Sequence, residues 1–124
     1  MKGFFNQILN INVSDKSHHV DAVDDSIFEK YLGGKGLSTY LLLKHNPPGV
    51  DPLSPENRLI FATGPLSGTA IWGSCRYGIY TKSPQTGFYS ESYSGGSVGD
   101  YIAKTGFDAV MVPVSYTHLT LPTN

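Results

Sequence analysis

The chain has 124 residues, of which 40% are apolar and 15% charged, and its formal net charge at pH 7 is −1. This composition is typical of one folded domain rather than a disordered chain, and the charge gives no electrostatic reason to expect nucleic acid or an anionic membrane as a partner. No apolar run approaches the roughly 20 residues of a membrane helix, and we expect no signal peptide. The single cysteine, Cys75, excludes an internal disulfide and an all-cysteine metal site, so we expect a cytoplasmic protein.

The N-terminal residues predict a hairpin. Apolar and polar residues alternate over 6–13, which indicates a strand with Leu9, Ile11 and Val13 on one face and asparagines on the other. A turn-forming segment follows, and residues 18–23 provide the second strand.

Two helices and a buried strand are expected next. Asp24 or Asp25 can cap a short helix over 26–32, which stops at the glycines 33 and 34. Helical spacing of leucines and a tyrosine predicts a second helix over 36–45, and two prolines end it. The apolar run 59–62 lies between turn signals and is typical of a buried strand.

The second half of the chain predicts strands over 76–82 and 88–93, a helix over 97–105, and a valine-rich strand over 107–113. Short turns join several of these elements. The predicted fold class is therefore α+β, a β-rich arrangement of hairpins and sheets with a few short helices.

Residues 1–113 are expected to form a partial domain. Residues 114–124 lack an amphipathic pattern that continues the preceding strand, and their back-translation resembles a transposon-end adapter used in sequencing libraries. We interpret 114–124 as a non-native tail and expect the natural reading frame to continue beyond residue 113.

The strongest chemical signal lies between Gly73 and Gly99. The turn 94–97 precedes a predicted helix, and its two glycines leave backbone N–H groups open to an anion. Arg76 follows small residues that leave room for a phosphate-binding guanidinium. Lys82 could reach the same place, but its position before a turn favours a solvated charge. The plainer alternatives are a tight turn and a surface arginine. The spacing matches neither a Walker loop nor a dinucleotide fingerprint.

The remaining polar candidates form no catalytic set. Cys75 is expected to pack as a small residue. His18 and His19 are adjacent, so on a strand they point to opposite faces and cannot share a metal. Glu91 and Asp108 are isolated carboxylates without a partner in the sequence for acid–base work.

Several short motifs, in order along the chain, resemble the N-terminal domain of the aldehyde ferredoxin oxidoreductase family. Each motif is weak alone, but together they cover residues 4–112. They are Asn10–Ser14, Tyr31–Leu37, Asp51–Asn57, Ala62–Thr69, Arg76-Tyr77, Thr81–Gly87, Ser94–Gly96 and Gly106–Val110.

The resemblance implies a β-rich base whose sheets cradle two pterin dithiolenes that hold tungsten or molybdenum, that is, a tungstopterin or molybdopterin cofactor. It implies that Arg76 contacts the pterin near a 4Fe-4S cluster. It further implies that Tyr93, Ser94, Gly95 and Gly96 line the pterin, with the Tyr93 backbone oxygen meeting Mg²⁺. Position 93 is often asparagine in the family, so a role for its side chain would not carry over to Tyr93.

The parent protein implied by the resemblance is an oxidoreductase that converts an aldehyde to a carboxylic acid and passes electrons through the cluster to ferredoxin. A homodimer is the assembly that it implies for the parent. The cluster ligands and catalytic residues are expected outside this chain, so the chain alone should be inactive. Two other classes stay open: a stand-alone anion- or nucleotide-binding module, and a structural β-domain that pairs with a separate subunit.

Overall fold

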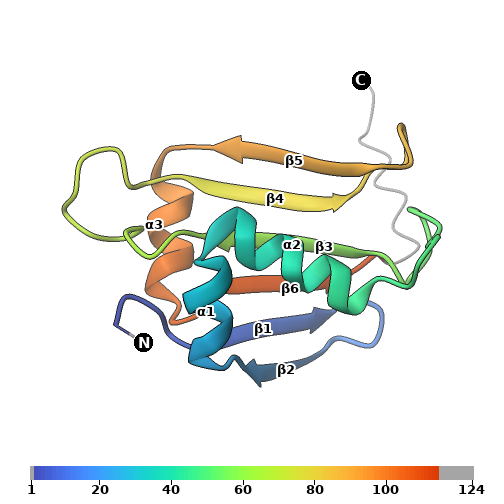
Figure 1. The fold of residues 1–124 in the computed structure, drawn as a ribbon, viewed down its shortest axis with the longest axis horizontal. Helices are drawn as coiled ribbons and strands as arrows, with labels where there is room; N and C mark the ends of the chain where they lie inside the picture. The colour runs from blue at the N-terminus through green and yellow to red at the C-terminus, as the bar shows by residue number, and fades with distance from the viewer. Residues whose placement is uncertain (1, 115–124) are drawn as a thin grey trace.

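The computed structural model describes residues 2–114, which form one mixed β-sheet with helices on one face and at one end (Figure 1). Helices α1 and α2 lie across the near face of the sheet, and α3 lies at the end where β5 leads into β6. The strands are β1 (Gln7–Asn12), β2 (Ser17–Ala22), β3 (Arg58–Thr63), β4 (Tyr77–Lys82), β5 (Tyr89–Ser94) and β6 (Ala109–Pro113); the helices are α1 (Asp25–Tyr31), α2 (Gly34–His45) and α3 (Ser97–Lys104).

The strand order in the sheet is β2-β1-β6-β3-β4-β5. Antiparallel pairing joins β1 to β2 and β4 to β5, as the sequence predicted for these two hairpins, and it also joins β3 to β4. The last strand, β6, inserts between β1 and β3, parallel to β1 and antiparallel to β3. The predicted α+β class is confirmed, and each predicted element is present with ends displaced by no more than about two residues.

The core lies between the sheet and the two helices on its near face. Ile60, Tyr80 and Met111 point from three strands toward Phe28 of α1 and Leu37 of α2, and all five are at most 3% exposed. Burying each such side chain stabilises the fold by about 1.5–3 kcal/mol. Packing of α2 on β3 and β4 therefore fixes where α2 begins relative to the sheet.

The face of β1 that enters this core is not the more apolar one. Leu9 and Ile11 do share a face, as predicted, but that face is half-exposed, whereas Ile8 and Asn10 are buried. Asn10 tolerates burial because its amide donates to the carboxylate of Asp21 at 2.9 Å. Pairing of β1 with β6 sets this register, placing Ile8 beside the buried Ala109.

The connection between α1 and α2 is shorter than the sequence predicted, and α1 does not end at a glycine. Asp24 is the N-cap of α1, and its carboxylate accepts the Ser26 N–H at 2.9 Å. The C-cap is Leu32, which takes a φ of 57° in the left-handed region that usually favours glycine. Helix α2 then begins at Gly34, two residues earlier than predicted.

No helix within residues 2–114 is long and apolar enough to cross a membrane. The predicted non-native tail lies, apart from Val114, outside the described residues.

Candidate functional site

A hollow of about 330 Å³ opens where β4, β5 and the loop after β3 meet the start of α2. Arg76 and Tyr93, two of the residues proposed from the sequence, both line it. Lys35 of α2 lines it as well, and its floor includes Ala62 and Gly78. The hollow thus combines two cationic side chains with a floor of small residues.

Pairing of β4 with β5 brings Arg76 and Tyr93 together. Arg76 directly precedes β4, and Gly78 of β4 stands opposite Tyr93 of β5. A side chain at position 78 would meet the Tyr80 hydroxyl at 2.1 Å, so glycine is required to leave room for the buried Tyr80 ring. That ring meets the ring of Tyr93 edge-on, with centroids 6.0 Å apart.

The guanidinium of Arg76 is exposed and has no hydrogen-bond or ion-pair partner within residues 2–114. Its backbone carbonyl accepts from the Ser67 hydroxyl at 3.3 Å, which ties the strand entrance to the loop wall of the hollow. A guanidinium carries five N–H donors in a planar fork that matches phosphate or carboxylate oxygens. Arg76 therefore offers its full donor set to a ligand.

Close backbone packing at the α1–α2 corner places Lys35 at the hollow. A Cβ on Gly36 would lie 1.8 Å from the backbone oxygen of Tyr31, so only glycine permits this approach. Lys35 then falls in the first turn of α2, which carries no acidic residue. A cation at that end opposes the helix dipole, at a cost of about 0.3–1 kcal/mol.

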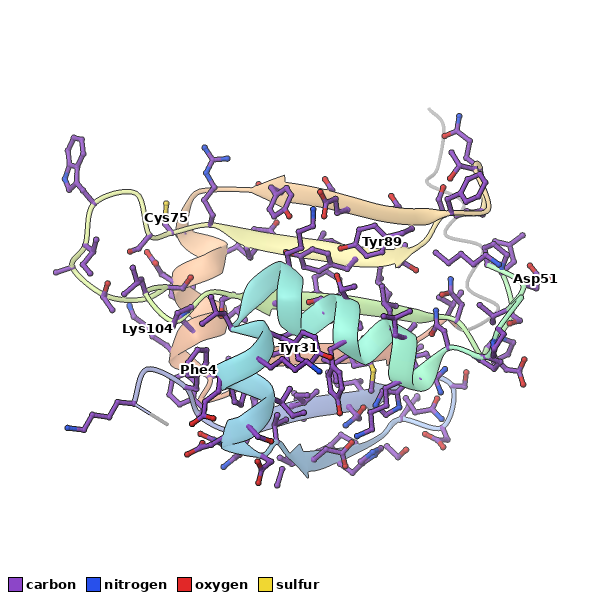
Figure 2. All side chains as sticks on the ribbon, viewed as in Figure 1. Phe4, Tyr31, Asp51, Cys75, Tyr89 and Lys104 are labelled. Carbon is purple, nitrogen blue, oxygen red and sulfur yellow. The ribbon has the colours of Figure 1, made fainter. Side chains whose placement is uncertain are left out.

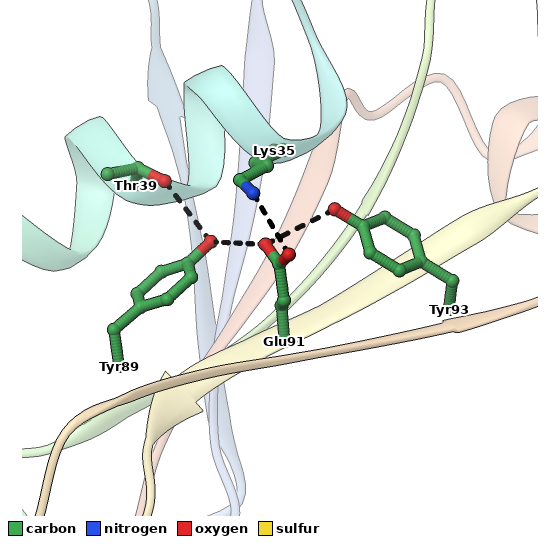
Figure 3. Close-up of polar contacts among 5 residues, drawn as sticks. All are labelled: Lys35, Thr39, Tyr89, Glu91 and Tyr93. Atoms are coloured by element: carbon green, nitrogen blue, oxygen red, sulfur yellow. Dashed lines mark hydrogen bonds and ion pairs between the residues drawn. The ribbon is translucent and has the colours of Figure 1, made fainter.

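A polar cluster on β5 holds Lys35 (Figure 3). Its ammonium donates to one carboxylate oxygen of Glu91 at 2.9 Å, and the other oxygen accepts from the hydroxyls of Tyr89 at 3.2 Å and Tyr93 at 3.3 Å. The Thr39 and Tyr89 hydroxyls lie 3.2 Å apart. We call Lys35, Thr39, Tyr89, Glu91 and Tyr93 the Glu91 cluster.

Charges in the Glu91 cluster follow from these contacts. The Lys35 ammonium, with help from the two phenols, holds the pKa of Glu91 below its ordinary value, and Glu91 in turn raises the pKa of Lys35. Burial raises the pKa of Tyr80 beneath the cluster, so its phenol stays neutral. Lys35 and Glu91 are therefore both charged at neutral pH.

Sequence reasoning missed this cluster, because it treated Glu91 as an isolated carboxylate. Lys35 and Glu91 are 56 residues apart, and nothing local connects them. The alternation of β5 was the available signal, since residues 89, 91 and 93 must share one face of a strand.

The predicted turn of Ser94, Gly95 and Gly96 adjoins the hollow without lining it. Ser94 pairs with Tyr77 at the end of β5, and Gly96 is the N-cap of α3 with a φ of 86°. An added Cβ at Gly95 or Gly96 would meet no atom of residues 2–114 within 4 Å. The turn therefore leaves space beside its two glycines, and it lies near Arg76, which directly precedes the Tyr77 that pairs with Ser94.

The suggestion that Lys82 joins Arg76 is wrong. Lys82 ends β4, about 20 Å along the extended strand from Arg76, and its ammonium donates to the backbone oxygen of Val50. Val50 precedes Asp51, which Figure 2 places at the opposite end of the molecule from Cys75. Strand geometry separates the two cations, and Lys35 is the one that accompanies Arg76.

The other polar candidates from the sequence, Asp108, His18, His19 and Cys75, lie outside the hollow. Asp108 is buried and accepts the backbone N–H groups of Phe5 at 3.1 Å and Gln7 at 3.2 Å, while its burial raises its pKa. His18 and His19 are exposed on β2, and Cys75 is half-buried. Within residues 2–114, no three His, Cys, Asp or Glu side chains group closely enough to hold a metal ion.

Comparison with known families gives one match over most of the chain. The model of the aldehyde ferredoxin oxidoreductase N-terminal domain matches residues 8–114. Tungsten-containing aldehyde ferredoxin oxidoreductase of Pyrococcus furiosus is 45% identical over 112 residues, which are 90% of this chain and 18% of that protein. The enzyme of the same description from Thermococcus kodakarensis is 43% identical over the same shares.

A solved structure shares the fold. The active-site complex of benzoyl-coenzyme A reductase, in complex with 1,5-dienoyl-CoA, superposes with a TM-score of 0.86 at 35% identity, over 90% of this chain and 17% of that one. The chain thus spans less than a fifth of the length of the relatives it matches.

Proposed function

This chain belongs to the aldehyde ferredoxin oxidoreductase family, and from that premise we propose that the hollow is one wall of the tungsten–pterin site of an oxidoreductase. The observation that carries the proposal is the Arg76 guanidinium, which has no partner among the described residues 2–114 and lines the same hollow as Tyr93 and Lys35. The relatives named above contain tungsten, which supports this cofactor over an unrelated anion.

The residues present fit the anionic part of such a cofactor. Arg76 would hold phosphate or pterin oxygens through two parallel N–H donors, and the backbone of Ser94, Gly95 and Gly96 would offer further N–H groups. In this proposal the backbone oxygen of Tyr93 would bind Mg²⁺, and the role would not need the side chain of the asparagine that is common at this position. A hollow of about 330 Å³ is near the small end of ligand sites, so it would take part of the cofactor and the parent protein the rest.

The proposed net reaction of the parent enzyme is aldehyde plus water to carboxylic acid, with release of two protons and two electrons. When bound, the pterin-held tungsten supplies the two-electron chemistry; a 4Fe-4S cluster and ferredoxin would carry the electrons away in the cytoplasm. Within this chain, Arg76 has the role of binding and orienting, not of proton transfer. We expect the purified 124-residue chain to show no aldehyde-dependent reduction of viologen, and measurable reduction would contradict this division of roles.

A titration of the chain with neopterin monophosphate, a pterin that carries one phosphate ester, tests the site. Two-dimensional ¹H–¹⁵N NMR should show the amides around Arg76, Gly95 and Gly96 shifting together. Arg76→Gln should weaken binding about tenfold or more, because a hydrogen bond to a charged group contributes about 1.5–3 kcal/mol. The matched control is Arg58→Gln, since Arg58 lies on β3 and donates to the Pro55 carbonyl at 2.8 Å. Equal binding by both variants would refute the site.

The benzoyl-coenzyme A reductase likeness favours a second candidate for the parent, a reductase of aromatic thioesters. Both candidates use the same wall of the cofactor site. Assays of the full-length parent with an aldehyde and with an aromatic acyl-CoA separate them.

A further inference from the structure

Lys35 is the second cation of the hollow, and a carboxylate of the chain itself occupies it. Its ammonium lies 2.9 Å from Glu91, while Arg76 in the same hollow has no partner within residues 2–114. An incoming anion can therefore bind to the free donors of Arg76 and compete with Glu91 for the ammonium of Lys35.

The two oxygens of Glu91 have separate donors. Among residues 2–114, one oxygen accepts only from Lys35, whereas the other accepts from the phenols of Tyr89 and Tyr93. If Lys35 leaves, the Glu91 carboxylate keeps its two hydrogen bonds from the phenols, and solvent reaches its partly exposed side chain, so its charge stays stabilised. Tyr89 is itself held beside Thr39 of α2, so these contacts secure Glu91 on β5 independently of the lysine (Figure 3).

Exposure of the two side chains also favours movement of the lysine. The Lys35 side chain is 59% exposed and the Glu91 side chain is 29% exposed. A four-carbon stem with a compact ammonium changes direction readily, whereas Glu91 is fixed by the two phenols. Tyr89 and Tyr93 therefore hold Glu91 in place, and Lys35 is the partner that can move.

We propose that Lys35 turns from Glu91 to bind a phosphate-type anion together with Arg76, and that Glu91 holds the ammonium in place until the anion arrives. The inference depends on the proposed function for its site, but assigns a ligand role to Lys35 and a counter-ion role to Glu91. The anion chemistry is a phosphate dianion, either the phosphate ester of a pterin or free phosphate.

Titration of the 124-residue chain with inorganic phosphate and, separately, neopterin monophosphate tests the exchange. Lys35→Gln should weaken binding of both probes about fivefold, whereas the control Lys30→Gln, on the exposed end of α1, should not change it. Glu91→Gln should strengthen binding about threefold, because it removes the competing charge, and Glu29→Gln is its control. In NMR spectra of the lysine ammonium groups, the chemical shift of the Lys35 signal should change on addition of phosphate. After that addition, the shift should no longer depend on the presence of the Glu91 carboxylate.

The outcomes separate the two proposals. Weaker binding by Arg76→Gln with unchanged binding by Lys35→Gln overturns the role of Lys35 and leaves the Arg76 site standing. Binding that Glu91→Gln weakens as much as Lys35→Gln overturns the counter-ion role, because Glu91 would then only position the lysine. Absence of binding to the unmodified chain overturns the site and the exchange together. Tighter binding of neopterin monophosphate than of phosphate identifies the ester as the source; equal binding identifies free phosphate.

Discussion

The α1–α2 corner gives the sharpest test of the structure, through the substitution Gly36→Ala. A methyl group there would lie 1.8 Å from the backbone oxygen of Tyr31, and a backbone atom cannot swing aside as the end of a flexible side chain can. Without the clash, alanine inside a helix would stabilise the chain by about 1 kcal/mol relative to glycine. With it, the corner must open, and overpacking of this kind typically costs about 1–3 kcal/mol.

The overpacking cost, less the propensity gain, gives an expected net loss of about 1 kcal/mol in the free energy of unfolding for Gly36→Ala, equivalent to a fall of about 3–5 °C in Tm. Urea denaturation followed by far-UV circular dichroism measures it, with an unchanged dependence on urea showing that the unfolded state is the same. Gly64→Ala is the matched control, because a Cβ there would meet no atom of the described residues within 4 Å and the φ of Gly64 is not positive. Stability equal to or above that of the unsubstituted chain would refute the packing argument.

Three further substitutions test other contacts. Asp24→Ala removes the N-cap of α1 and should lower the free energy of unfolding by about 1 kcal/mol in the same urea experiment; no loss would mean that the cap carries no energy. Because the pKa of Glu91 is lowered in the folded chain, its contribution to stability is present above its ordinary pKa of 4.5 and is lost as the pH falls through the folded value. Glu91→Gln should therefore make the free energy of unfolding depend less on pH over that acidic range. An unchanged pH profile would contradict the pairing with Lys35. Burial raises the pKa of Tyr80 above 10.0, so in an alkaline ultraviolet titration the last tyrosine to ionise should disappear in Tyr80→Phe, and its persistence would contradict the burial.

Local signals were sufficient for the elements and insufficient for their arrangement. Hairpins such as β1–β2 and β4–β5 depend on alternation and on short turns, which the sequence displays directly. The insertion of β6 between β1 and β3 depends on pairing between residues far apart in sequence, 101 positions for Ile8 with Ala109 and 47 positions for Ala62 with Ala109. The same long-range pairing buries Ile8 and Asn10 instead of Leu9 and Ile11, which alternation alone could not decide.

Prediction of the site divides in the same way. Arg76 and Tyr93 were found through motifs, and the structure brings both to one hollow because β4 and β5 form a hairpin. Lys35 was missed as the second cation of the hollow because it enters from α2. Lys82 was considered as a companion of Arg76 because Arg76 directly precedes β4 and Lys82 ends it. Residues that are close in sequence along an extended strand lie far apart in space, because a strand rises about 3.3 Å per residue. Packing of a helix on the sheet, in contrast, brings residues that are remote in sequence together.

Departures from local rules concentrate in the segment that places Lys35. Leu32 takes a left-handed φ of 57°, Lys35 opposes the dipole of α2, and Gly36 admits no side chain beside Tyr31. Each departure costs stability on its own, by about 0.3–1 kcal/mol for a cation in the first turn. A segment selected for stability alone would have ended α1 with glycine and begun α2 with an acid. These three departures lie within five residues, at the edge of the hollow that Arg76 lines. Such a concentration is expected where the backbone conformation is needed for ligand binding rather than for stability. The same reasoning predicts that Lys35→Glu, which restores the favoured charge at the start of α2, abolishes phosphate binding through the added negative charge and the repulsion from Glu91, and unaltered binding measured by the phosphate titration would refute it.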